Sequence, residues 1–328
     1  MSLVAALRRL FAAEPTPPSA SAPPLAGPPA AAPECAPAAV EVPVPEPRLR
    51  SVQCIGAHGL HRIAYTEWGD PDNPRVLVCV HGLTRNGRDF DDLARAMARH
   101  YRVVCPDVAG RGRSAWLAVK DDYQLPTYVA DMITLIARLN VDSVHWVGTS
   151  MGGLIGMLIA SMPDNPIRRL VLNDVGPVVT AASLQRIGEY VGRAPLFPGY
   201  EAAERYIREI SAPFGHLSDA QWRHLTETSV KEVDGGWAMR YDPGIGDPFR
   251  KSPVLADVSL WPVYEAIGCP TLVVRGAESD LLLHETAAQM AARGPQARLV
   301  EVPGVGHAPT LMDDAQIAPV RDFLLEGG

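Results

Sequence analysis

The sequence lacks features that several classes of protein require. It has no Cys-x-x-Cys pair, no His-x-x-x-His and no apolar run near the roughly 20 residues of a membrane-spanning helix. Its 30 basic residues are outnumbered by 37 acidic ones, which gives a formal net charge of −7. We therefore expect no metal centre and no membrane span. Neither nucleic acid nor an anionic membrane surface is expected as the main partner.

The five cysteines are odd in number and scattered, which argues against a disulfide framework. Cys79 and Cys105 lie inside apolar runs, where a free thiol behaves as a small hydrophobic group. The apolar N-terminus, residues 1–13, is interrupted by Arg8 and Arg9, whereas a secretory signal carries its charge before the apolar core. These observations favour a cytoplasmic protein.

Composition divides the chain into an N-terminal extension and a globular part. Residues 14–47 are rich in proline and alanine, a composition that cannot continue a helix or a central strand. We therefore predict a disordered extension over residues 1–47. The remainder belongs to a chain of 328 residues that is 47% hydrophobic, enough for one large domain with an insertion.

From residue 48 onward, apolar strand-like runs alternate with helical patterns. The run from Arg75 to Val80 is almost wholly apolar, as expected of a strand buried on both faces. This alternation predicts an α/β fold with a doubly wound, mostly parallel sheet, built from residues 48–176 and 263–328. Strands are expected at residues 51–57, 60–68, 75–80, 101–105, 141–147, 168–172, 271–275 and 298–302.

The alternation stops between residues 177 and 262, where helical patterns dominate. Helices are expected at 181–192, 200–210 and 218–231. We interpret this segment as an inserted, mainly helical cap over the strand ends. Trp237 and Tyr241 form an aromatic patch in it that could line an acyl pocket.

The sequence from Gly148 to Gly152 reads Gly-Thr-Ser-Met-Gly, between the expected strand at 141–147 and a helix-forming segment at 154–161. A strand, a sharp turn and a helix in that order are the context of a nucleophile elbow, in which Ser150 sits at a strained backbone position. Glycine is required on both sides because strand and helix pass too close there for a Cβ atom. Ser150 is therefore the candidate nucleophile.

Five motifs together resemble the α/β-hydrolase fold, in its cap-bearing, esterase-like branch. They occur in the family's order, each after an expected strand, over about residues 50–328. The motifs are His81-Gly82-Leu83, Asp107-x-x-Gly110-x-Gly112-x-Ser114, Gly148-Thr-Ser150-Met-Gly152-Gly153, Gly276-x-x-Ser279-Asp280 and Gly304-x-Gly306-His307.

A serine nucleophile needs a base to take its proton and an acid to orient that base. In this fold the three follow the order Ser, acid, His, which Ser150, Asp280 and His307 satisfy. Alternatives remain at two of the positions. Glu278 and Asp174 are rival acids, since some relatives place the acid after the strand at 168–172, and His284 is a rival base.

An oxyanion hole needs two backbone N–H donors. One is expected from Met151, directly after the nucleophile, and the resemblance implies Leu83 for the other. The triplet His58-Gly59-Leu60 repeats His-Gly-Leu but does not end a buried apolar run, so we reject it. Arg85, Arg111 and Arg113 are candidate anion binders, although loop arginines are more often solvated.

The resemblance and the triad order imply a serine hydrolase that cleaves a carboxylic ester of a small or medium-sized substrate through an acyl-enzyme on Ser150. A lactonase, a C–C bond hydrolase, an aminopeptidase, a perhydrolase and a non-turnover ligand-binding protein are the alternatives. Serine at the elbow excludes dehalogenase and epoxide hydrolase chemistry, which use aspartate there. No Gly-x-Gly-x-x-Gly follows an early strand, and we expect no cofactor. The partner expected is a small ester-like molecule, and the oligomeric state is left open.

Overall fold

A computed structural model describes residues 46–193, 195–251 and 256–327. Nearly all of the extension predicted over residues 1–47 lies outside these residues. The first strand, β1 (Arg48–Gly56), begins where the composition turns globular.

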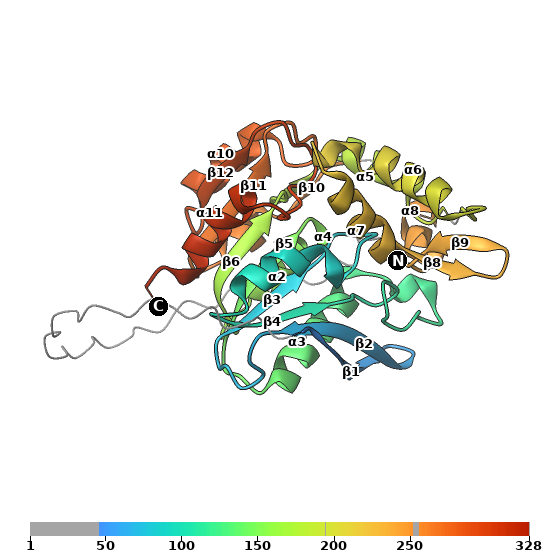
Figure 1. Cartoon of the computed structure of the whole chain (residues 1–328). Helices are drawn as coiled ribbons and strands as arrows, with labels where there is room; N and C mark the ends of the chain where they lie inside the picture. The colour runs from blue at the N-terminus through green and yellow to red at the C-terminus, as the bar shows by residue number, and fades with distance from the viewer. Residues whose placement is uncertain (1–45, 194, 252–255, 328) are drawn as a thin grey trace, which may run out of the picture.

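The core is an eight-stranded sheet with the strand order β1-β2-β4-β3-β5-β6-β11-β12 (Figure 1). In this sheet the neighbours from β4 through β3, β5, β6 and β11 to β12 pair in parallel, whereas β1 with β2 and β2 with β4 are antiparallel. The predicted doubly wound, mostly parallel sheet is confirmed. After β1, its strands are β2 (Gly59–Trp68), β3 (Val76–Val80), β4 (Arg102–Pro106), β5 (Val144–Thr149), β6 (Ile167–Asn173), β11 (Thr271–Gly276) and β12 (Arg298–Val302).

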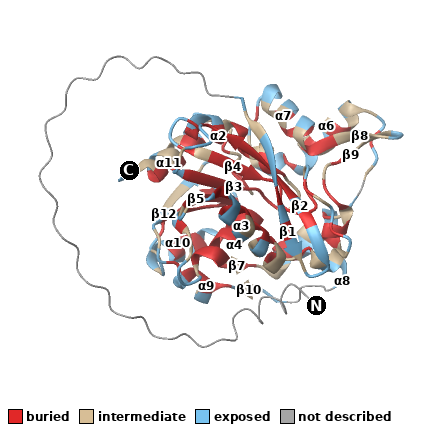
Figure 2. Ribbon diagram, turned by 90° about the horizontal axis from the view of Figure 1, so that it is seen from below, coloured by how far each residue is buried: buried red, intermediate tan, exposed pale blue. Residues whose placement is uncertain are grey.

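Burial follows the apolar runs of the sequence. Every residue of β3 and of β11 is buried. In β1, at the edge of the sheet, only Val52 and Cys54 are buried, and Figure 2 shows the contrast between β1 and β3. A strand covered on both faces can be apolar throughout, and β3 has this composition because helices cover both faces of the sheet.

Two hydrophobic clusters cover the two faces of the sheet. On one face α2 (Asp91–Met97) and α11 (Asp314–Leu325) pack on alternate residues of β3, β4 and β11. On the other face lie α3 (Leu125–Leu139), α4 (Met151–Ala160), α9 (Trp261–Glu265) and α10 (His284–Ala292). Short 3-10 helices, η1 (Gly87–Phe90) and η2 (Lys120–Asp122), lie in the connecting loops.

Residues 177–262, called the inserted segment below, lead from β6 into α9, and the helices of its described part lie beside the sheet rather than on a face of it (Figure 1). The helix expected to end at residue 231 ends at Ser229, and a hairpin that the sequence analysis missed follows it. The elements are β7 (Val178–Val179), α5 (Ala181–Tyr190), α6 (Tyr200–Ile210), η3 (Ala212–Phe214), α7 (Asp219–Ser229), β8 (Val230–Val233), β9 (Gly236–Met239), η4 (Pro243–Gly246), α8 (Asp247–Lys251) and β10 (Val258–Ser259).

Backbone hydrogen bonds join the inserted segment to the loops at the carboxyl ends of the strands. The N–H of Gly112, after β4, donates to Arg240 O at 2.8 Å, and the N–H of Gly306, after β12, donates to Pro213 O at 2.7 Å. The strand order reverses between β3, which is followed in the chain by β4, and β5 on its other side. Ligands of open α/β sheets bind at such a switch point. No helix in the described part of the chain is long and apolar enough to cross a membrane.

Candidate active site

Ser150 occupies the turn between β5 and α4 with φ 51° and ψ −114°, a region that a non-glycine residue rarely adopts. The two glycines make this turn possible. A Cβ on Gly152 would lie 1.9 Å from Val80 O, and a Cβ on Gly148 would lie 2.3 Å from the carbonyl carbon of Gly152. The expected elbow geometry is confirmed: β3, β5 and α4 approach too closely for a side chain.

His307, in the loop after β12, bridges Ser150 and an aspartate. Its Nε2 is 3.0 Å from Ser150 Oγ and its Nδ1 is 2.7 Å from Asp174 Oδ2. A carboxylate can only accept, so Nδ1 carries the ring proton and Nε2 is free to accept the serine proton. The three side chains, from the loops after β5, β6 and β12, can therefore pass a proton from the hydroxyl to the ring.

The expectation that Asp280 would contact His307 is wrong. The side chain of Asp280 is 58% exposed and pairs with Arg186 on α5, with a distance of 3.0 Å between Arg186 Nη2 and Asp280 Oδ1. His284, the rival base, is also exposed and lies 3.1 Å from Glu301. The carboxylate at the histidine is that of Asp174, the alternative acid.

Asp174 is fully buried, and three donors hold its carboxylate. Besides His307, the N–H of Gly276 donates to its Oδ1 at 2.9 Å, and Ser279 Oγ donates to its Oδ2 at 2.6 Å. The loop after β11, where the acid was expected, thus supplies a hydroxyl that holds the carboxylate of Asp174, which follows the neighbouring strand β6. Asp174 has φ 54°, which aspartate tolerates better than most residues.

Both predicted oxyanion-hole residues lie beside Ser150. Met151 is the first residue of α4, so its N–H has no acceptor within the helix. Leu83 follows β3, and a Cβ on the preceding Gly82 would lie 3.7 Å from Ser150 Cβ. Their role as donors to an oxyanion stays a prediction.

His81 supports this loop rather than acting as a base. Its Nε2 accepts the N–H of Val108 at 2.9 Å and its Nδ1 donates to Gly82 O at 2.6 Å, which fixes the neutral tautomer. Burial lowers the pKa of this ring to about 4. The two bonds join the loops after β3 and β4.

The neutral state of His81 predicts a loss of stability in acid. Its pKa of about 4 lies below the ordinary value of 6.5, so between these values only the unfolded chain binds a proton at this site. The contribution of neutral His81 to the free energy of unfolding is complete above pH 6.5 and is lost as the pH falls through 4. The total loss is roughly 3 kcal/mol. Urea unfolding at several pH values in this range should show this fall in the free energy of unfolding. The His81→Gln variant should have a shallower dependence on pH, and an equal slope in both proteins would contradict the assignment.

Asp107 explains the motif that follows β4. Its buried carboxylate accepts the N–H of Gly87 and the N–H of Arg113, each at 2.8 Å, while burial raises its pKa. A Cβ on Gly112 would lie 2.3 Å from its Oδ2, which excludes a side chain there. The motif is therefore structural: it fixes the loops after β3 and β4 relative to each other.

A cavity of about 130 Å³ lies at Ser150 and His307. Trp237 and Tyr241, expected in the pocket, do not line it. The Trp237 ring packs edge-on against Tyr200, and the buried Tyr241 donates its hydroxyl to Arg193 O. The lining comprises Gly82, Leu83, Thr84, Arg85, Asp89, Phe90, Thr149, Ser150, Ile187, Tyr190, Ile210, Ser211, Phe214, Leu225, Met239, His307, Ala308, Pro309 and Thr310.

The apolar residues by which the inserted segment lines the cavity were not identified from the sequence. Ile187 and Tyr190 are three residues apart on α5, a spacing that marks a common helix face. That signal was present in the sequence, but it does not say what the face covers.

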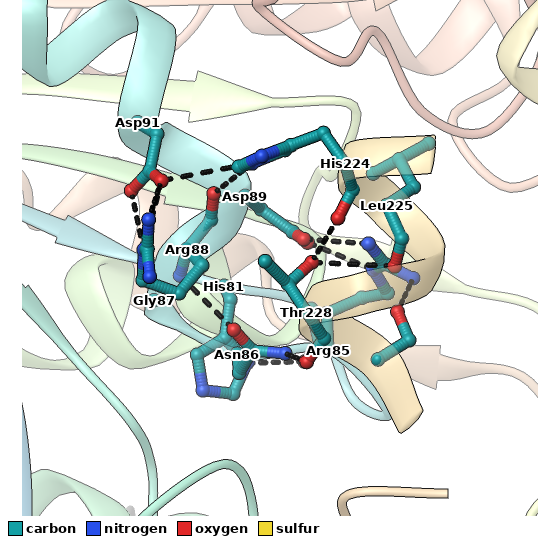
Figure 3. Close-up of polar contacts among 12 residues, drawn as sticks. His81, Arg85, Asn86, Gly87, Arg88, Asp89, Asp91, His224, Leu225 and Thr228 are labelled. Atoms are coloured by element: carbon teal, nitrogen blue, oxygen red, sulfur yellow. Dashed lines mark hydrogen bonds and ion pairs between the residues drawn. The ribbon is translucent and has the colours of Figure 1, made fainter. Parts of the chain in front are cut away.

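A cluster of polar contacts, shown in Figure 3, joins the loop after β3 to α7. Arg85 makes a two-pronged ion pair with Asp89, at 2.6 and 2.9 Å, and donates to Ser229 Oγ at 2.8 Å. Asn86 Nδ2 donates to Thr228 O at 2.9 Å, and His224 Nε2 is 3.1 Å from Arg88 O. The charge of Arg85 at the cavity is therefore neutralised by Asp89, and this side chain is not a free cation that could bind an anion.

A second group of polar side chains lies away from this site. Cys54, His61 and Asp131 are buried, with potential metal-ligand atoms within 4.8 Å of one another. His61 Nε2 is already 2.8 Å from Asp131 Oδ1, a hydrogen-bond distance, so this pair joins β2 to α3. The rejected triplet at His58 lies in the β1–β2 turn, where His58 pairs with Asp122.

Comparison with known proteins shows that this chain is similar to hydrolases. The model of the alpha/beta hydrolase family matches residues 77–320. A 3-hydroxybutyrate-oligomer hydrolase from Cupriavidus necator is 56% identical over 285 residues, which are 84% of this chain and 97% of that protein.

Solved structures show the same similarity. A putative hydrolase from Rickettsia typhi superposes with a TM-score of 0.80 at 35% identity, over 86% of this chain and all of that one. An alpha/beta hydrolase from Novosphingobium aromaticivorans has a TM-score of 0.75 at 38% identity, over 84% of this chain and 98% of that one.

Proposed function

This chain belongs to the alpha/beta hydrolase family, and from that premise we propose that it cleaves carboxylic esters, in particular short oligomers of 3-hydroxybutyrate. The observation that carries the proposal is the hydrogen-bonded chain Ser150–His307–Asp174. It corresponds to nucleophile, base and acid. The identity of the substrate is taken from the relative that is 56% identical.

Acylation begins when His307 Nε2 accepts the Ser150 proton as Oγ attacks the ester carbonyl carbon. Asp174 stabilises the imidazolium that forms, through the bond to Nδ1. The backbone N–H groups of Leu83 and Met151 hold the carbonyl oxygen as it becomes an anion. His307 then protonates the leaving alcohol, and a water molecule activated by the same ring releases the acid from Ser150.

The inserted segment acts as a cap in this proposal. Ile187 and Tyr190 on α5, with Met239 from β9, close the cavity with apolar groups, and the polar cluster of Figure 3 joins α7 to the core. A cavity of about 130 Å³ with a neutralised arginine suits a short, uncharged acyl unit. A long fatty chain would need the cap to move.

A substrate panel tests this proposal. We expect kcat/KM for the trimer of 3-hydroxybutyrate to exceed that for a hexadecanoyl ester by about 100-fold, because a small apolar pocket discriminates by size. Product acid is measured by titration, with the butyryl ester of 4-nitrophenol as a matched short control. Turnover of a lactone or of a ring-cleavage dienoate at a higher kcat/KM would contradict the proposal, and so would turnover of none of the esters.

A further inference from the structure

The loop after β4 carries an arginine that the proposed mechanism does not use. The Arg111 side chain is 0% exposed, although a guanidinium is charged at every pH that proteins tolerate. Removing an ionised group from water costs several kcal/mol unless its surroundings compensate. A fully buried arginine therefore needs an explanation in what it contacts.

The groups that Arg111 contacts are uncharged. Its Nε donates to Leu83 O at 2.8 Å, and its Nη1 donates to Ala109 O at 2.6 Å and to Tyr128 Oη at 2.8 Å. Its Nη2 lies 3.7 Å from Met151 Sδ. Its guanidinium carbon is 5.0 Å from the centre of the Tyr128 ring, within the range of a cation–π contact.

The carboxylate of Asp242 does not neutralise it. Asp242 Oδ2 already accepts from Lys120 Nζ at 2.5 Å and from Tyr123 Oη at 2.6 Å. Within the part of the chain that the structure describes, the hydrogen bonds and ring contacts of the Arg111 side chain include no carboxylate. None of these contacts therefore neutralises the positive charge of Arg111.

Two of the residues that Arg111 contacts, Leu83 and Met151, are the predicted donors of the oxyanion hole. A guanidinium is a rigid planar fork, so three fixed acceptors define its position and it in turn fixes them. Preorganised donors and a nearby positive charge both lower the energy of an anion that forms in a water-poor site.

We infer that Arg111 is a positioning residue for ester hydrolysis: it fixes the Leu83 backbone at the oxyanion hole and stabilises the negative charge that forms there. The inference rests on the proposed function. During acylation an electron pair of Ser150 Oγ forms the new C–O bond while the carbonyl π pair moves to oxygen. Arg111 gives up no proton and touches no reacting atom.

The loop after β4 also has a structural role, because its backbone attaches the inserted segment to the core. The Arg111 backbone pairs with Tyr241, and the neighbouring Gly112 N–H donates to Arg240 O. These backbone contacts do not depend on the guanidinium. Replacing the side chain alone therefore separates an effect on the oxyanion hole from an effect on the attachment of the inserted segment.

The test compares three variants of the full chain with the wild type. Arg111→Met removes the charge at similar length, Arg111→Lys keeps the charge without the fork, and Arg113→Met is the matched control because that neighbouring arginine is exposed. For each, kcat and KM are measured with 4-nitrophenyl butyrate. Inhibition by a trifluoromethyl ketone, which forms an anionic tetrahedral adduct with an active serine, is measured beside them. Thermal unfolding reports the fold.

We expect kcat of Arg111→Met to fall by about 100-fold or more, with KM changed less than about threefold. The affinity for the ketone should fall in parallel, Arg111→Lys should recover part of both, and Arg113→Met should match the wild type. A folded Arg111→Met with wild-type kcat and ketone affinity overturns the inference. If Arg111→Met does not fold, the inference is overturned by a folded Arg111→Lys whose kcat and ketone affinity equal those of the wild type. Absence of ester hydrolysis in the wild type would instead show that the proposed function is wrong.

Discussion

Replacing Ser150 with alanine should lower kcat for 4-nitrophenyl butyrate by about a million-fold, because no other group at this position can form the acyl-enzyme. The hydroxyl lies 3.0 Å from His307 Nε2, within reach of the base. The substitution removes a single oxygen and leaves the elbow glycines in place. The fold should therefore be unchanged, and the loss should appear in kcat rather than in thermal stability.

Two measurements make this prediction specific. The burst of nitrophenol that accompanies acylation should vanish in Ser150→Ala, and a serine-reactive phosphonate should label the wild type at Ser150 alone, as seen by peptide mass spectrometry. Ser161→Ala is the matched control, since that hydroxyl closes the other end of α4 by donating to Leu158 O at 2.9 Å. Ester hydrolysis that survives in Ser150→Ala, or labelling at another residue, would remove the basis for the mechanism.

Replacing Asp174 with asparagine should lower kcat by about 10,000-fold. An amide in place of the carboxylate no longer stabilises the imidazolium and can donate to Nδ1, which selects the wrong tautomer of His307. The buried carboxylate is 2.7 Å from that nitrogen. The Asp280→Asn variant should keep kcat within about twofold, because an exposed ion pair such as the one with Arg186 contributes little.

The pair of variants decides between the acid expected from the sequence and the acid at the histidine in the structure. Both proteins are assayed with the same ester, and circular dichroism with thermal unfolding shows whether each is folded. Asp174 also accepts from Gly276 and Ser279, so Asp174→Asn is expected to be somewhat less stable. A large loss in Asp280→Asn together with a small one in Asp174→Asn would contradict the assignment.

The fold and the elbow turn at Ser150 were predictable because their signals are local. A strand buried on both faces is rich in apolar residues, so β3, which is apolar throughout, and β11, with its apolar run Leu272–Val274, are visible in the sequence. The elbow at Ser150 needs glycine at two fixed positions, for the steric reason that Val80 O and the carbonyl group of Gly152 leave no room for a Cβ. The hairpin of β8 and β9 was missed because its four-residue strands are too short to show a period.

The acid illustrates the limit of sequence order. Asp174 and Asp280 both lie between Ser150 and His307 in the chain, and both follow a strand. Strands β6 and β11 are neighbours in the sheet, with Asn173 paired to Val274, so both aspartates leave the same edge of it. Only the path of each loop decides which side chain faces the histidine, and in the loop after β11 it is Ser279 that points inward.

The sequence by itself determined the layered fold and the position of the elbow, because strand burial and glycine sterics act over a few neighbouring residues. The order of the motifs also placed His307 in the loop after the last strand. The tertiary structure alone decided which carboxylate meets His307, which residues of the inserted segment line the cavity, and that Arg111 is buried against Leu83 and Met151. Those contacts join loops more than 20 residues apart in the chain. Their geometry depends on how the loops pack together, which no local pattern of residue types records.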